Sequence, residues 1–165
     1  MVGSPEVNKI IRKIISPALR QYGFTKVKAR NYWLYRENEI WYIVIKSVGS
    51  YFSQVTGFPS QSVSVSYGIY FTNMPSLATP KIDKDGLAVP KEYECQFRGS
   101  IENIVCQKHL RKDFGSEPER NRKNIWWISN DGSNIDDAIE DIKNSLMANA
   151  IPDMESASKN LFIDN

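Results

Sequence analysis

The stretch Ile40-Trp41-Tyr42-Ile43-Val44-Ile45 decides the fold, because every side chain in it is apolar or aromatic. A β-strand places successive side chains on opposite faces of its sheet, so a strand of this composition needs cover on both faces. The pattern predicts an inner strand that lies between two layers. At least one of those layers must then be a helix packed on the sheet.

A second strand is predicted between residues 62 and 71. Large and small side chains alternate there: Val63, Val65, Tyr67, Ile69 and Phe71 against Ser62, Ser64, Ser66 and Gly68. This two-residue period is typical of a half-buried strand. Residues 27–36 are also aromatic and β-like, and the polar turn 37–39 follows them. We therefore expect residues 27–36 to form an antiparallel hairpin with the strand at residues 40–45.

Helical spacing of apolar residues opens the chain. A first helix is predicted from Ser4-Pro5 to Gly23, and its apolar stripe is formed by Val7, Ile10, Ile11, Ile14, Ile15 and Ala18. Pro17 predicts a kink or a restart within this helix. The reason is that proline removes a backbone hydrogen bond and clashes with the preceding turn.

A second amphipathic helix closes the chain, with apolar positions from Ile135 to Met147 and acidic residues in its first turns. Carboxylates are favourable at that end of a helix because of the helix dipole. Pro152 is predicted to end this helix. Residues 150–165 are then expected to form a tail that either docks loosely or frays.

The segments between these elements have weaker patterns. Residues 49–61 predict a mobile loop, and residues 72–90, with three prolines, predict a long connection that is either functional or flexible. Residues 92–97 alternate and predict a fourth strand. Residues 111–123 predict a charged loop, and residues 125–128 predict a short buried strand or a plug.

Together these elements contain no alternating βαβ pattern, so the expected class is α+β. The expected architecture is a mostly antiparallel sheet of about four to five strands with N-terminal and C-terminal helices packed on it. Residues 1–165 are expected to form a single domain.

The composition suits a globular protein of ordinary charge. Of the 165 residues, 41% are hydrophobic and 24% are charged, and the net charge of +2 neither requires nor excludes a polyanionic partner. Two cysteines, Cys95 and Cys106, are too few for a disulfide framework, so free thiols in a reducing compartment are expected. No apolar run approaches the roughly 20 residues of a membrane span, and no signal peptide opens the chain. We expect a cytoplasmic protein without membrane contact.

The sequence patterns argue against several kinds of chemistry. One histidine and two distant cysteines do not make a zinc site, and Asp83-Lys84-Asp85 lacks the rest of an EF-hand loop. No glycine-rich phosphate loop is present. Cys106 and His109 would be neighbours on a helix, but a surface pair is the simpler interpretation. The acidic run 136–141 is explained by the helix dipole. We therefore expect no catalytic residue, no metal and no cofactor.

A basic face is predicted on the first helix. Lys9, Arg12, Lys13 and Arg20 gather opposite the apolar stripe, and the first thirty residues hold seven basic residues against the single acid Glu6. Such an asymmetry would steer an acidic partner or a nucleic acid to this helix. The alternative is a solvated helix face that pairs with the acidic C-terminal helix.

A ligand cleft is the second candidate surface. Ser62, Ser64 and Ser66 line one face of the alternating strand, and Gly68 leaves room for close backbone approach. Aromatic side chains over that face would create an apolar cleft with a few polar groups. The aromatic candidates are Trp33, Tyr35 and Trp41. The alternative is an antiparallel sheet face in contact with solvent.

The order of these signals resembles a known family. The segments that carry the resemblance are Ala18–Phe24, Arg30–Trp33, Ser64–Ile69, Tyr93–Arg98, the pair Trp126-Trp127 and the closing helix. They look like the bacterial domain of unknown function family numbered 4304. The resemblance implies a small cytosolic α+β protein from bacteria, without an assigned reaction and without catalytic residues to carry over.

Three hypotheses about function follow. The first is a non-catalytic module that binds another protein, with immunity-type neutralisation of a toxin as one concrete version. The second is nucleic-acid binding through the basic face of the first helix. The third is an enzyme with an unrecognised site that uses Arg98, His109 or the serine-lined face. The sequence does not predict the oligomeric state.

Overall fold

The computed structural model describes residues 2–111 and 121–163, with the backbone alone for 161–163. Five strands form one antiparallel sheet in chain order: β1 (Lys26–Lys28), β2 (Asn31–Arg36), β3 (Glu39–Ser47), β4 (Val63–Phe71) and β5 (Phe97–Ser100). The helices in these ranges are α1 (Ser4–Tyr22), α2 (Gly49–Thr56), α4 (Ile135–Ser145), the π-helix η3 (Leu146–Ala150) and α5 (Ile151–Ile163). Short 3-10 turns are η1 (Glu92–Glu94) and η2 (Lys108–Arg111). The predicted α+β class is confirmed. None of the described helices is long and apolar enough to cross a membrane.

β3 is the inner strand that the apolar hexapeptide predicted. It pairs with β2 on one side and with β4 on the other, and the turn between β2 and β3 makes the expected hairpin. The hexapeptide side chains divide between the two faces: Trp41, Ile43 and Ile45 toward the helices, and Ile40, Tyr42 and Val44 away from them. All of them are buried.

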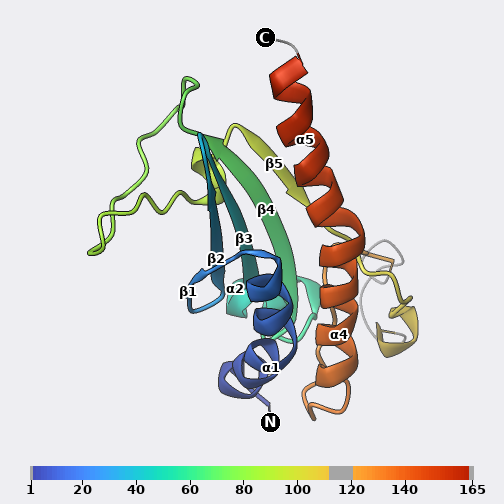
Figure 1. Cartoon of the computed structure of the whole chain (residues 1–165). Coiled ribbons are helices and arrows are strands. Elements are labelled where there is room, and N and C mark those ends of the chain that lie inside the picture. The colour runs from blue at the N-terminus through green and yellow to red at the C-terminus, as the bar shows by residue number, and fades with distance from the viewer. Residues whose placement is uncertain (1, 112–120, 164–165) are drawn as a thin grey trace.

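α1, α4 and α5 lie on one side of the sheet (Figure 1). There the predicted apolar stripe of β4 packs against α1, α4, η3 and α5 in the main hydrophobic core. α1 ends at Gly23, whose positive φ of 133° lets the chain turn and bury Phe24.

α1 runs through Pro17 as one helix, so the predicted restart is wrong. Pro17 lies on the exposed side of α1, where water can satisfy the carbonyl that loses its backbone donor. Ile15 and Leu19 are buried on the opposite side. Their packing on both sides of the proline offsets the lost hydrogen bond.

Pro152 does not end the closing helix, which is a second correction. α4 continues through η3 into α5, and Pro152 is the second residue of α5. A π-helical turn widens the backbone, so that the proline ring and its missing N–H can be accommodated. Ile151 and Met154 of α5 are buried in the core. Ser158 also donates to the buried carboxylate of Glu39, over 2.6 Å, which ties α5 to the sheet.

Two connecting segments also differ from the prediction. Residues 49–61 contain the helix α2, which buries none of its own residues and so leaves no apolar stripe in the sequence. Residues 92–97 form η1 and only the start of β5. Here buried Glu94 accepts the backbone N–H of Lys91 at 2.9 Å and closes a turn, although the alternating pattern predicted an extended strand.

The segment 125–128 acts as a plug at the start of β4. Trp126 is fully buried and exchanges two backbone hydrogen bonds with Val63, over 2.8 and 3.2 Å. This is a single bridge rather than a strand. The charged loop expected over residues 111–123 lies largely outside the described residues.

Candidate functional site

The predicted cleft residues lie partly on the face of the sheet that is turned away from the helices, which we call the far face. Trp33 of β2 stands opposite Tyr42 of β3, and their rings stack with centroids 5.5 Å apart. Ser64 stands opposite Lys46, and Ser66 follows two residues later on the same face. The structure therefore brings Trp33, Ser64 and Ser66 onto one face of the sheet, where Trp33 is buried and the two serines are half-buried.

Trp41 and Ser62 do not join that surface. Trp41 has the opposite strand parity from Tyr42, so its ring lies in the helix-side core beside Phe24, with a centroid distance of 6.5 Å. Ser62 precedes β4 and is fully buried. Its hydroxyl accepts the backbone N–H of Ile128 at 3.0 Å, so it helps to hold the plug.

A long segment between β4 and β5, residues 72–96, extends along the far side of the sheet, and we call it the arm (Figure 1). Its middle folds back on itself as a small hairpin. Asp83 donates its N–H to Leu87 O at 2.9 Å, and Val89 donates to Lys81 O at 2.9 Å. The connection that had no period in the sequence is thus held by local backbone pairing.

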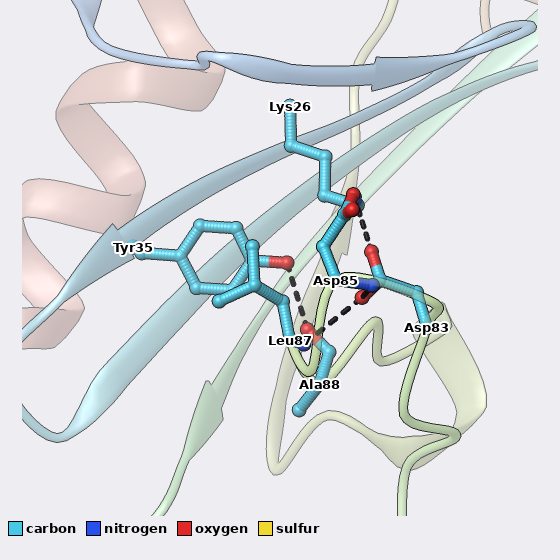
Figure 2. Close-up of polar contacts among 6 residues, drawn as sticks. All are labelled: Lys26, Tyr35, Asp83, Asp85, Leu87 and Ala88. Atoms are coloured by element: carbon cyan, nitrogen blue, oxygen red, sulfur yellow. Dashed lines mark hydrogen bonds and ion pairs between the residues drawn. The ribbon is translucent and has the colours of Figure 1, made fainter.

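Asp83 fixes both the hairpin turn and its position on the sheet (Figure 2). Its Oδ1 accepts the backbone N–H groups of Asp85 and Leu87, each at 2.9 Å. Its Oδ2 forms an ion pair with Lys26 of β1, which also reaches Asp85 at 3.5 Å. The Lys26 ammonium and these backbone donors hold the pKa of Asp83 below its ordinary value, and the Asp83 carboxylate raises the pKa of Lys26.

Aromatic side chains of β2 hold the returning strand of the arm. The Tyr35 hydroxyl donates to Ala88 O at 2.8 Å, as Figure 2 shows. The Trp33 indole N–H donates to Pro90 O at 2.9 Å from a buried position. Both polar groups donate to main-chain carbonyls of the arm. The arm is therefore anchored by side chains of the sheet and not by a continued β-ladder.

A cleft of about 420 Å³ opens where the end of the arm meets β3 and β5, and its lining residues are Tyr42, Lys46, Lys91, Glu92, Tyr93 and Arg98. Lys46 pairs with Glu92 at 2.8 Å across the cleft. Apart from this ion pair, the charged lining residues are Lys91 and Arg98, so the net formal charge of the lining is positive. Tyr42 and Tyr93 supply apolar surface. The arrangement can bind an anion.

Lys91 is the most desolvated cation in this cleft. Its ammonium lies 5.3 Å from the Trp33 ring centroid and 5.8 Å from that of Tyr42, and it donates to Asn31 Oδ1 at 3.2 Å. Burial lowers the pKa of Lys91, and the positive charge of Lys28 adds to this effect. A neutral amide and two aromatic faces stabilise the ammonium less than a carboxylate would.

The basic face of α1 is exposed as predicted by the helical wheel. Lys9, Arg12, Lys13 and Arg20 are all exposed. Within the described residues no ion pair joins any of them to the acidic residues of α4 or α5. The expected alternative, pairing with the closing helix, is not what the described side chains do.

Comparison with known proteins now places the chain. A family model described as "Domain of unknown function (DUF4304)" matches residues 15–156. The chain belongs to this family. Comparisons with curated proteins and with solved structures gave no significant match. The DUF4304 match includes the far face, the arm and the cleft. That description assigns no reaction.

The remaining candidates in this DUF4304 chain have structural roles or stand apart. Cys106 and His109 line two different hollows, and Cys106 lies outside η2. Asp141 is buried and accepts the indole N–H of Trp126 at 2.9 Å and the N–H of Ile104 at 3.0 Å. Across residues 2–111 and 121–163, no group of three or more His, Cys, Asp or Glu residues could hold a metal ion.

Sequence reasoning missed Lys46 and Lys91 as site residues of this DUF4304 chain. Lys46 could have been found, because it shares the strand parity of Tyr42 and therefore its face. Lys91 had no local signal, since its place over Trp33 depends on how the arm returns to the sheet.

Proposed function

We propose that this DUF4304 chain is a non-catalytic protein-binding module of the bacterial cytoplasm, and that the arm contacts the partner. The observation that carries the proposal is the exposure of large apolar side chains along the arm: Met74, Leu77, Ile82, Leu87 and Tyr93. Leu77 is 96% exposed and Ile82 is 58% exposed. Exposed apolar side chains that gather on one segment are typical of interaction sites.

The anchoring of the arm supports the same function. Ion pairs and hydrogen bonds from β1 and β2 fix the hairpin on the sheet. A segment that is already ordered loses less conformational entropy when it binds, so its apolar side chains contribute more to affinity. The unpaired thiols of Cys95 and Cys106 support the reducing compartment.

Affinity purification from the source organism with paired variants tests this proposal. Replacing Leu77 and Ile82 by serine removes apolar surface from the arm, and we expect loss of a protein that the unaltered chain retains. The control replaces Tyr51 and Val55, which are exposed on α2, by serine and should keep that protein. Retention by the arm variant, or no retained protein at all, would contradict the proposal. A retained toxin encoded beside this chain would identify the immunity-type version.

Nucleic-acid binding is a second candidate, favoured by the exposed basic face of α1. Lys9, Arg12, Lys13 and Arg20 would neutralise phosphates, so affinity for a DNA or RNA duplex should fall steeply with salt. Replacing all four by glutamine should abolish binding, while glutamine at Lys81 and Lys84 of the arm should not. Affinity that does not change with salt concentration would exclude this candidate.

A further inference from the structure

Two cations in the cleft between the arm and β5 form no ion pair with a carboxylate among the described residues. Lys91 donates to the amide oxygen of Asn31 at 3.2 Å. Arg98 donates to the backbone carbonyls of Cys95 and Tyr93, at 2.9 and 2.6 Å. Positive charge in the cleft is therefore in excess, even though Lys46 is neutralised by Glu92.

The walls of the cleft indicate what kind of anion fits. Tyr42 and Tyr93 present rings, and the buried ring of Trp33 lies beneath the Lys91 ammonium. Apolar walls favour a ligand with an apolar or flat body. The carboxylate of Glu92 also lines the cleft, but it pairs with Lys46, so Lys91 and Arg98 are left as charge partners for an anion. Inorganic phosphate has no apolar body to contact these walls.

We infer that this cleft binds a carboxylate group carried on an apolar or flat body, with Lys91 and Arg98 as its charge partners. The volume of about 420 Å³ admits a ligand of the size of benzoate or an acidic side chain. A free aromatic carboxylate and the acidic side chain of a partner protein share this chemistry. The inference does not rest on the proposed function, because a free carboxylate would satisfy it.

Titration of the full chain with benzoate, followed by NMR of lysine side chains and backbone amides, tests the inference. We expect saturable shifts at Lys91 and around Tyr42 and Arg98. The neutral isostere benzamide should not produce them, and inorganic phosphate should bind more weakly than benzoate. The replacement Lys91→Gln should weaken benzoate binding by about fivefold. Lys84→Gln at the exposed hairpin tip should leave it unchanged.

Further variants and ligands make the outcome decisive. If Lys91→Gln fails to fold by circular dichroism, Arg98→Gln replaces it and should show the same loss. Tighter binding of the α-methylamide of N-acetylglutamate, whose one carboxylate is that of the side chain, than of benzoate would assign the carboxylate to an acidic side chain, and the reverse order to a free aromatic acid. Equal binding of benzamide, tighter phosphate binding or unchanged affinity in both variants would overturn the inference. The serine variant at Leu77 and Ile82 should bind benzoate normally, so this result is separable from that of the proposed function.

Discussion

Gly68 of β4 packs directly against the end of the arm and the start of β5. A Cβ at this position would be 2.8 Å from the Cβ of Cys95 and 2.8 Å from the carbonyl oxygen of Phe97. The room that glycine leaves is therefore filled by the protein's own chain. We expect Gly68→Ala to lower the free energy of unfolding by about 1–3 kcal/mol, because the backbone of β5 would have to shift.

Urea denaturation measures this change. Ser66→Ala is the matched control, since Ser66 lies on the same strand and the same face. It should change the free energy of unfolding by no more than about 0.5 kcal/mol. Equal stability of the glycine variant and the unaltered chain would contradict the close packing of the arm on β4.

Glu155 makes stability depend on pH. The ion pair with Arg36 at 2.8 Å, together with a hydrogen bond from Tyr22, holds the pKa of Glu155 below its ordinary value of 4.5. A group with a lowered folded pKa stabilises the protein above its unfolded pKa, and this stabilisation is lost as the pH falls through the folded value. The unaltered chain should thus lose its advantage over Glu155→Gln below about pH 4.5.

The expected difference at neutral pH is no more than about 1 kcal/mol, because both side chains are partly exposed and water screens the pair. Urea denaturation of both proteins between neutral pH and the acid range gives the profile. Glu37→Gln, in the exposed turn before β3, should run parallel to the unaltered chain. A difference that stays constant with pH would rule out the ion pair as its source.

Two tryptophans show how far the site could be predicted from single residues. Trp33 and Trp41 are equally aromatic in the sequence, yet they lie on opposite faces because Trp33 pairs with Tyr42 in the hairpin. The pairing register decides which face a side chain takes, and the composition of each strand does not contain it. By contrast, the alternation of serines in β4 could be recognised in the sequence. Ser64 and Ser66 lie on one face of the sheet, as this alternation predicted.

At the scale of elements, the arm hairpin depends on one carboxylate. Asp83 accepts two backbone N–H groups and pairs with Lys26, whereas among the described residues the side chain of Asp85 makes only the longer contact with Lys26. Asp83→Ala should therefore loosen the hairpin and expose Lys81 and Lys84 to trypsin, with cleavage several-fold faster than in the unaltered chain.

Asp85→Ala is the matched control for this experiment and should be cleaved at nearly the original rate. Mass spectrometry of the fragments identifies whether the cuts fall after Lys81 and Lys84. If the two variants are cleaved equally fast, the backbone bonds of Asp83 do not hold the hairpin together.

Elements with a strong period were predictable, and those held by local bonds were not. α1, β3, β4 and α4 each bury one or both of their faces, so apolar residues recur in their sequences at the spacing of a helix or a strand. α2 buries none of its residues. The turn η1 is closed by a hydrogen bond to the side chain of Glu94. The residues of this turn alternate in the sequence as those of a strand do. α5 was missed because the widened turn η3 before Pro152 leaves no signal in the sequence.

At the scale of the whole molecule, the two faces of the sheet have different occupants. The helices pack on one face and bury the main core there, and the arm packs on part of the other face (Figure 1). The α+β architecture followed from the apolar hexapeptide, because a strand buried on both sides requires a second layer. The sequence did not predict that a segment between β4 and β5 would supply part of that layer, since the arm has no apolar period.

The two outer strands of the sheet limit how any partner can be recognised. β1 has three residues and begins and ends with lysine, and β5 has four residues. Edge strands that are this short and carry these charges offer few free backbone groups to which a peptide could add as a sixth strand. Under the proposed binding function, recognition would use side chains, so that changes on the arm would alter the choice of partner while the sheet stays the same.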